Sequence, residues 1–238
     1  MARTIAFAGS KGGTGKTTVV ANLGVAMARL GRRVVLLDGD VMMADLALLL
    51  GVEDHKVTLH DVLAGEANIK KAIATGPEGV KVVPGGVSME GIKKAKLDGV
   101  KQVVQQLSKM FQFVLIDVPS GLDRDAITVM SQAKEVVIVV TPDLAAVSNA
   151  IKTKLVAEKL GLKNIGLVVT RAMEGGADIP PREISMVLDL PVLGVIPEDK
   201  AVRQSIALGE PVITKAPQAA ASREFKMLAF QFKVTPSS

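Results

Sequence analysis

Short runs of apolar residues, many of them β-branched, recur along the whole chain and alternate with longer segments whose apolar residues lie three or four positions apart. The runs are continuous rather than alternating, which is typical of strands that are buried on both faces of a parallel sheet. They predict strands at residues 4–9, 33–38, 80–85, 113–117, 135–140, 164–170 and 191–196.

The segments between these strands have the periodicity of helices. The spacing predicts helices at residues 17–30, 98–110, 123–132, 145–160, 181–188 and 199–208, and a last one at 219–234. Regular alternation of strands and helices indicates an α/β fold with a doubly wound, mostly parallel sheet and helices on both faces. No linker, repeat or low-complexity tract interrupts the pattern, so we expect a single domain spanning residues 1–238.

Composition narrows the class of protein. Of the 238 residues 48% are hydrophobic, yet no apolar run reaches the roughly 18–20 residues that a membrane-spanning helix needs. The first residues lack the pattern of a secretory leader, so we expect a cytoplasmic protein without a transmembrane segment. The absence of cysteine excludes disulfides, thiolate metal sites and iron–sulfur clusters. The net charge of +5 fits either a lysine-rich surface or a weak preference for nucleic acid or anionic lipid.

The strongest chemical signal is the stretch SKGGTGKTT at residues 10–18, between the first predicted strand and the first helix. In that position backbone N–H groups and the helix N-terminus converge on a phosphate, while Lys16 adds charge and Thr17 offers a hydroxyl to Mg²⁺. Ser10 stands where the strict P-loop pattern has its first glycine, whereas Gly15, Lys16 and Thr17 fit the remainder. The stretch therefore predicts a phosphate site for a nucleotide.

Three aspartates follow predicted strands. Asp38 and Asp40 come after one strand and Asp117 ends another, so all three reach the sheet edge that holds the glycine loop. Asp117 suits a ligand of Mg²⁺ or of its water, and Asp40 can orient an attacking water. Asp38 fits a site residue and a loop cap equally well. Gly121 belongs either to a nucleotide-sensing turn or to a plain strand-to-helix turn.

Together these residues resemble the MinD/ParA family of deviant Walker A ATPases, whose signature matches KGGTGKTT at residues 11–18. The resemblance extends over essentially the whole chain. DGD at 38–40 and DVPSGL at 117–122 look like the two switch segments of the family, and VVTR at 168–171 looks like its base-pocket segment. Other stretches, VTLHDVLAGEANIKKAI among them, look more like MinD than like plasmid-partition ParA.

The resemblance implies the P-loop NTPase fold, with ATP/ADP and Mg²⁺ as cofactors. The nucleotide-binding residues would be Lys11, Gly12, Gly13, Thr14, Gly15, Lys16, Thr17, Thr18 and Gly121, with Thr170, Arg171, Pro197 and Glu198 near the adenine. Thr17 and Asp117 would hold the metal. The catalytic residues would be Lys16 on its own nucleotide, Lys11 on the partner's nucleotide in an ATP-dependent homodimer, and Asp40 on the attacking water.

The sequence departs from the family pattern at two places besides Ser10. Asp45 stands where MinD commonly has asparagine, and an extra carboxylate there could slow hydrolysis or weaken the dimer. Ser148, Asn149 and Ile151 are uncharged, in a helix that carries charged partner contacts in MinD. The protein partners of MinD are therefore not carried over to this chain.

The last predicted helix has two apolar rows. Phe225, Leu228 and Phe232 form one row, and Met227, Phe230 and Val234 form the other. Its position matches the closing core helix of the family, and its aromatic rings also suit contact with a membrane interface. Both interpretations stay open at this point.

We therefore expect an ATP-hydrolysing dimerisation switch, weakly active and stimulated by a partner, of the kind that regulates septum placement in cell division. Its partner would be an anionic membrane surface or another protein, with a location at the periphery of the membrane or the nucleoid. The nearest alternative is a ParA-like partitioning ATPase that binds DNA non-specifically, which the net charge favours. A non-hydrolysing nucleotide-binding scaffold is another, motivated by Asp45. A phosphotransferase of the bacterial tyrosine-kinase type would lack its tyrosine tail, because the chain contains no tyrosine.

Overall fold

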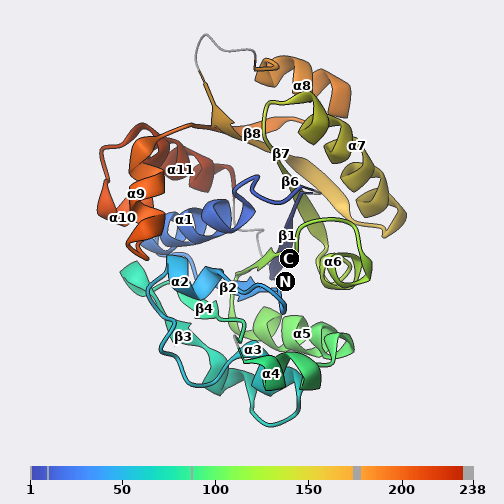
Figure 1. The fold of residues 1–238 in the computed structure, drawn as a ribbon, viewed down its shortest axis with the longest axis vertical. Coiled ribbons are helices and arrows are strands. Elements are labelled where there is room, and N and C mark those ends of the chain that lie inside the picture. The colour runs from blue at the N-terminus through green and yellow to red at the C-terminus, as the bar shows by residue number, and fades with distance from the viewer. Residues whose placement is uncertain (1, 10, 87, 174–177, 233–238) are drawn as a thin grey trace.

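A computed structural model of the chain describes residues 2–9, 11–86, 88–173 and 178–232. Within these ranges eight strands form one sheet in the order β3-β4-β2-β5-β1-β6-β7-β8, and helices cover both of its faces (Figure 1). Neighbouring strands are parallel except β3 and β4, which are antiparallel. The predicted doubly wound, mostly parallel fold is confirmed.

The strands agree with the hydrophobic runs, with one addition. They are β1 Arg3–Ala8, β2 Val34–Asp38, β3 Ala74–Thr75, β4 Lys81–Val83, β5 Phe113–Asp117, β6 Glu135–Val140, β7 Lys163–Ala172 and β8 Val192–Pro197. The two-residue edge strand β3 was not predicted, because it is too short to show a pattern. Strand β4 is shorter than the predicted 80–85: Pro84 has no N–H for the ladder, and its carbonyl accepts the Leu59 N–H at 2.8 Å.

The long helices lie where the spacing predicts them. The helices are α1 Lys16–Arg29, α2 Leu46–Leu49, α3 Leu59–Leu63, α4 Met89–Lys94, α5 Val100–Met110, α6 Arg124–Met130, α7 Leu144–Lys159, α8 Pro181–Leu188, α9 Lys200–Ala207, α10 Val212–Lys215 and α11 Ala220–Gln231. Three short 3₁₀ turns occupy Ile69–Ala72, Pro77–Gly79 and Leu97–Gly99, and the last of these covers the start of the predicted helix 98–110. Helices α2, α3, α4 and α10 were missed, since six residues or fewer do not establish a helical period.

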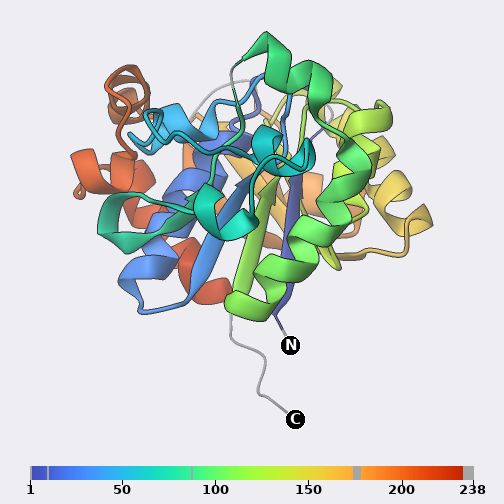
Figure 2. The ribbon, with the colours of Figure 1, turned by 90° about the horizontal axis from the view of Figure 1, so that it is seen from below.

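The sheet separates two apolar layers. Ile5 and Phe7 of β1 point to the layer under α1 and α11, whereas Ala6 and Ala8 point to the layer that α5 and α6 cover. Figure 2 shows β2, β5 and β1 side by side, with α5 packed against β5 and β1. Burial on both faces explains why the strands appear as continuous apolar runs.

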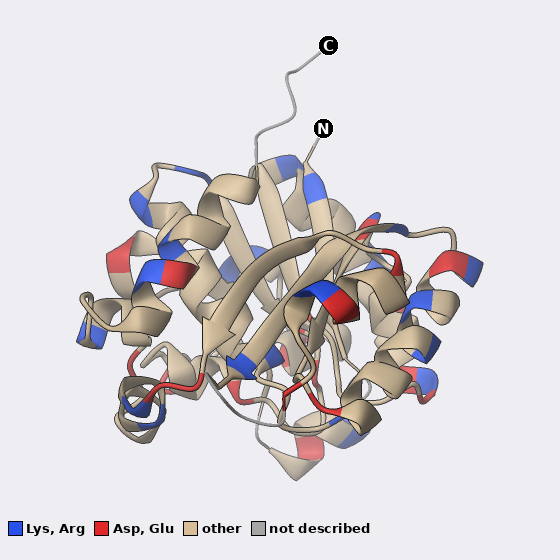
Figure 3. Ribbon diagram, turned by 90° about the horizontal axis from the view of Figure 1, so that it is seen from above, with Lys and Arg blue, Asp and Glu red and all other residues tan. Residues whose placement is uncertain are grey.

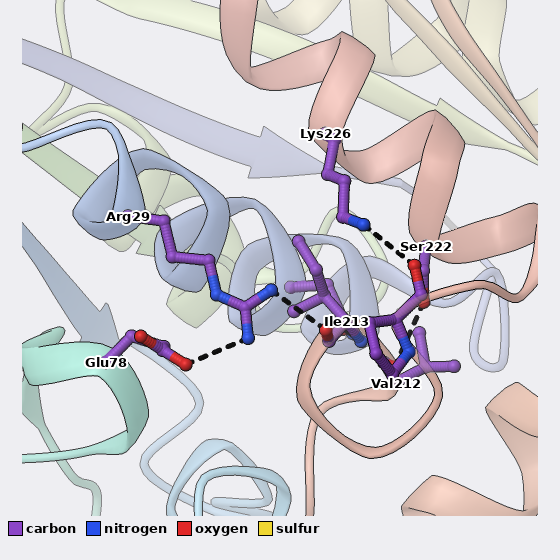
Figure 4. A network of polar contacts seen from close by, with 8 residues as sticks. Arg29, Glu78, Val212, Ile213, Ser222 and Lys226 are labelled. Atoms are coloured by element: carbon purple, nitrogen blue, oxygen red, sulfur yellow. Dashed lines mark hydrogen bonds and ion pairs between the residues drawn. The ribbon is translucent and has the colours of Figure 1, made fainter.

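Helix α11 uses one of its two apolar rows for the core. Phe225, Leu228 and Phe232 are buried, while Met227 and Phe230 are 59% and 54% exposed. Val234 lies outside the described residues. Polar contacts also fix this corner of the molecule: the Ser222 hydroxyl donates to the Val212 carbonyl of α10 at 3.0 Å, and Arg29 of α1 donates to the Ile213 carbonyl at 3.0 Å (Figure 4). The core interpretation therefore holds for the first row.

Candidate functional site

The glycine loop joins β1 to α1 at the carboxyl edge of the sheet. Gly13 and Gly15 have φ angles of +79° and +82°, in the left-handed region that glycine adopts at little cost. Gly9 is required for a different reason: a Cβ there would lie 2.6 Å from the carbonyl oxygen of Val139. The loop ends at the N-terminus of α1, a fourteen-residue helix without a side-chain cap, so its first N–H groups face the loop.

Thr170 of β7 holds this loop from the neighbouring half of the sheet. Its hydroxyl donates to the Thr14 carbonyl at 2.6 Å and lies 3.3 Å from the Val140 carbonyl. The Thr14 hydroxyl is buried and has no hydrogen-bond partner in the described part of the chain. The loop is thus anchored by its backbone, and one buried polar atom is left for a ligand.

Asp117, Thr17 and Lys16 meet behind the loop. The Asp117 carboxyl is buried and hydrogen-bonded to the Thr17 hydroxyl. Burial raises the pKa of Asp117 to about 6, although the Thr17 bond and the Lys16 ammonium act in the opposite direction. Lys16 is only 7% exposed; burial lowers its pKa, and the charges of Asp117 and Asp40 partly restore it. The three side chains form a buried, strongly polar cluster at the start of α1.

This cluster fits a magnesium ion. Oδ1 of Asp117 is buried and has no hydrogen-bond partner among the residues that the structure describes. A free carboxylate oxygen beside a threonine hydroxyl at a phosphate loop is the oxygen donor set that Mg²⁺ takes together with phosphates and water. No cluster of three or more His, Cys, Asp or Glu side chains suited to a metal occurs in the described ranges. Magnesium does not need one, because it commonly binds through one or two carboxylates plus substrate phosphates.

Asp38 ends β2 and Asp40 lies two residues further on, in a different environment. Asp38 is fully buried, and its carboxylate accepts the N–H of Asp40 at 3.3 Å and of Leu46 at 3.2 Å. Burial, with the nearby Asp117 charge, raises the pKa of Asp38 well above its ordinary value. Oδ1 of Asp40 accepts the N–H groups of Met42 and Met43 at 3.2 and 2.9 Å. Asp38 is therefore a buried carboxylate that fixes the backbone of the loop through two hydrogen bonds, whereas Asp40 is a partly exposed carboxylate beside Lys16.

Lys11 differs from Lys16 in burial and in partner. Its side chain is half exposed, and Nζ lies 3.7 Å from Oδ1 of Asp143. Asp143 caps α7 by accepting the Ala146 N–H at 2.9 Å, and a hydrogen bond from the Thr141 hydroxyl lowers its pKa. Lys11 thus rests on the surface beside the loop, held by one long ion pair.

The two remaining loop predictions concern residues 12 and 121. A Cβ on Gly12 would lie 3.9 Å from the Ser120 hydroxyl, which places the glycine loop next to the segment after β5. Gly121 has a φ angle of +98°. Glycine adopts this left-handed conformation at little cost, in a nucleotide-sensing turn and in a plain strand-to-helix turn alike.

The predicted adenine residues line one cavity. Thr170, Arg171, Pro197 and Glu198 surround it together with Gly15 and Thr18, and Ile196 and Phe225 give it an apolar floor. Arg171 has a φ angle of +55°, where the register of β7 slips against β8. The Glu198 carboxylate accepts two hydrogen bonds from Arg203, so it is committed to a neighbour on α9.

A second hollow beside the phosphate loop contains Asp45. Lys16, Thr17 and Thr18 line it together with Asp45 and Leu48. The charge of Asp45 contributes to the raised pKa of Asp117. The departure noted in the sequence therefore lies on the wall of the site.

Sequence reasoning missed two residues at or beside this site, Asp143 and His60, and one contact between two predicted residues. Asp143 was not singled out, although it holds Lys11; the Thr170–Thr14 bond was not foreseen; and His60, whose Nε2 lies 2.8 Å from the Val41 carbonyl, was not considered. Such contacts join positions far apart in the chain, and no local pattern reports them.

No helix in the described parts of the chain combines the length and apolar character needed to cross a bilayer.

Comparison with known proteins finds nucleotide-binding proteins similar to this chain. A model of the CobQ/CobB/MinD/ParA nucleotide binding domain matches residues 5–212. An uncharacterized ATP-binding protein of Methanocaldococcus jannaschii is 40% identical over 229 residues, which cover 96% of this chain and 87% of that protein.

Two solved structures of MinD are similar over nearly their whole length. The cell division ATPase MinD of Pyrococcus furiosus is 42% identical with a TM-score of 0.94, and the match covers 97% of this chain and 98% of that one. The septum site-determining protein MinD of Pyrococcus horikoshii, complexed with Mg-ADP, is 39% identical with a TM-score of 0.94, covering 97% and 96%.

Proposed function

This chain belongs to the CobQ/CobB/MinD/ParA family of nucleotide-binding domains, and we propose that it is a MinD-like, magnesium-dependent ATPase that forms a homodimer when ATP is bound. The observation that carries the proposal is the contrast between its two loop lysines. Lys16 is buried against Asp117, in reach of a nucleotide bound to its own chain. Lys11 is half exposed on a single weak ion pair, so it is free to reach the nucleotide of a second copy.

Each group of site residues has its own role in hydrolysis. Loop N–H groups and Lys16 bind the phosphates, Thr17 and Asp117 hold Mg²⁺, and Asp40 orients the attacking water. The metal supplies charge neutralisation at the phosphates when it is bound. Lys11 of the second copy adds positive charge that stabilises the transition-state charge at the phosphates, so hydrolysis depends on assembly. Thr170, Arg171, Pro197 and Glu198 surround the base.

The proposed cellular role is spatial regulation of cell division. The similarity to a cell division ATPase MinD and to a septum site-determining protein MinD supports this role. The ATP-bound dimer would act at an anionic membrane surface or on a partner protein.

A ParA-like role with non-specific DNA binding is the second candidate, and the net charge of +5 supports it. Lys and Arg positions are spread over both flanks in the view of Figure 3, where they stand among Asp and Glu positions. A spread of this kind gives DNA less to bind than one basic surface would. We therefore rank the membrane or protein partner first.

The dimer is tested by sedimentation velocity with saturating ATP and Mg²⁺. Asp40→Ala should trap the dimer, because it removes the residue assigned to the attacking water and leaves both lysines in place. Lys11→Ala should bind ATP and stay monomeric, while Lys16→Ala should lose ATP binding. An Asp40→Ala protein that stays monomeric with ATP bound would contradict the proposal.

A turnover assay and a cosedimentation assay test the rest. Turnover by the native protein equal to that of Lys16→Ala would indicate a non-hydrolysing scaffold. The ATP-loaded Asp40→Ala protein is then sedimented with anionic liposomes and, in parallel, with DNA. Binding to liposomes supports the MinD-like role, and salt-sensitive binding to DNA supports the ParA-like role.

A further inference from the structure

His60 is a buried histidine outside the nucleotide site. It lies in α3, is 1% exposed, and its Nε2 is 2.8 Å from the carbonyl oxygen of Val41. A carbonyl can only accept, so the Nε2 nitrogen carries a proton and donates it. Val41 directly follows Asp40, and the imidazole therefore holds the main chain next to the carboxylate assigned to the attacking water.

The loop that contains Asp40 has few other outside supports. Its first part is fixed by Gly39, whose N–H donates to the Asp117 carbonyl at 3.0 Å, and its end by Asp38, which accepts the Leu46 N–H. Between these points, Asp40 accepts the N–H groups of Met42 and Met43 in its own loop. In the described part of the chain, two side chains outside this stretch bond to its backbone: Asp38 at the end of β2 accepts the Asp40 N–H at 3.3 Å, and His60 of α3 donates to the Val41 carbonyl.

The start of α3 and two glycines hold the imidazole in place. Thr58 and Asp61 form a capping box that starts α3, with the Thr58 N–H 2.7 Å from the Asp61 carboxylate. A Cβ on Gly86 would lie 2.3 Å from Nδ1 of His60, and a Cβ on Gly91 would lie 3.1 Å from it. Two glycine backbones therefore press against the ring and prevent it from moving away from Val41.

Nδ1 of His60 is buried and has no hydrogen-bond partner among the described residues. A buried polar atom without a partner lowers stability, so packing alone would favour an apolar side chain of similar size here. The observed histidine keeps a donor on Val41 in spite of that cost.

We infer that His60 is a positioning residue for hydrolysis: it fixes the Val41 carbonyl and thereby places the Asp40 carboxylate, without touching the nucleotide. This inference rests on the proposed function, in which Asp40 orients the attacking water. It differs from a purely structural role because it concerns the rate of the chemical step rather than the stability of the fold.

Two substitutions separate the donor from the volume of the ring. His60→Gln keeps an N–H donor near the position of Nε2, and His60→Leu keeps a similar volume without a donor. We expect His60→Leu to lower kcat about tenfold to a hundredfold, as small misplacements of a catalytic group do, with KM and the ATP dissociation constant within about twofold of the native values. His60→Gln should retain most of the native kcat.

The inference is wrong if His60→Leu and His60→Gln have the same kcat, or if the loss appears in ATP affinity instead. Should His60→Leu fail to fold, Gly86→Ala serves instead, because its methyl group would lie 2.3 Å from Nδ1 and must displace the ring. A folded Gly86→Ala protein with native turnover would overturn the inference. The Asp40→Asn, His60→Leu double variant should be no slower than Asp40→Asn alone. If Asp40→Asn itself hydrolyses ATP at the native rate, the proposed role of Asp40 fails separately from the His60 inference.

Discussion

Replacing Asp117 by asparagine should stabilise the metal-free, nucleotide-free protein while removing its activity. The pKa of Asp117 is about 6 against an ordinary 3.8, chiefly because the carboxyl is buried. Ionising it at neutral pH therefore costs on the order of 3 kcal/mol of folding free energy, since one pKa unit corresponds to about 1.36 kcal/mol. The attraction between Lys16 and the Asp117 carboxylate is already part of that pKa. The loss of this attraction in the asparagine variant therefore adds no further cost to the roughly 3 kcal/mol.

The pH dependence gives the sign of the effect. Below about pH 3.8 the carboxyl is protonated in the folded and the unfolded chain, and the native protein suffers no penalty from Asp117. The penalty grows between pH 3.8 and about 6, where only the unfolded chain has lost its proton, and is constant at higher pH. Asp117→Asn should thus gain about 2–3 kcal/mol at pH 7.5 and much less at pH 4.5.

Urea denaturation in the presence of EDTA, at both pH values, measures this difference. Asp123→Asn is the matched control, because Asp123 is a helix cap of α6 outside the buried cluster. Asp117→Asn should also lose magnesium-dependent ATP hydrolysis. A loss of stability at pH 7.5, or a gain that is equal at both pH values, would refute the electrostatic reasoning.

Three further predictions concern the loop and its neighbours. Thr170→Val should lower the unfolding free energy by about 1–2 kcal/mol in urea, with Thr170→Ser close to native, because the buried loop carbonyl loses its donor. Gly9→Ala should cost about 1–3 kcal/mol or more and weaken ADP binding in calorimetry, since its Cβ would lie 2.6 Å from the Val139 carbonyl. Asp143→Asn should keep the cap of α7, change stability by less than about 1 kcal/mol and release Lys11. Its ATP-dependent dimer should then form at lower protein concentration in sedimentation velocity, whereas an unchanged or weaker dimer would show that the ion pair does not restrain the lysine.

The layers of this fold could be predicted from the sequence because each major strand is buried on both faces. Runs such as Phe113–Asp117 report that burial directly, since every residue in the strand is apolar until the aspartate at its end. Short elements give no such signal. Helix α3 has five residues, and only its Thr58–Asp61 capping box marks where it begins.

The site could be predicted as a set of positions but not as a set of contacts. Strand ends bring Asp38 and Asp117 side by side, and the parallel register of β2 and β5 pairs these two residues. Their different environments depend on packing: Asp38 faces its own loop, while Asp117 keeps an unpartnered oxygen beside Thr17. Spacing along the chain does not show which of the two carboxylates bonds to backbone N–H groups and which keeps a free oxygen.

The two loop lysines show how burial can divide one motif into a fixed part and a movable part. Moving Lys16 out of its site would leave the buried Asp117 carboxylate without the positive charge that stabilises it, which is strongly unfavourable. Moving Lys11 breaks one exposed ion pair 3.7 Å long, and such pairs contribute about 0–1 kcal/mol. The energy needed to release Lys11 is therefore well within what contact with a second nucleotide can supply, whereas Lys16 stays with its own chain. In the proposed dimer, lysines five residues apart would serve binding at one position and assembly at the other, because only Lys16 is buried.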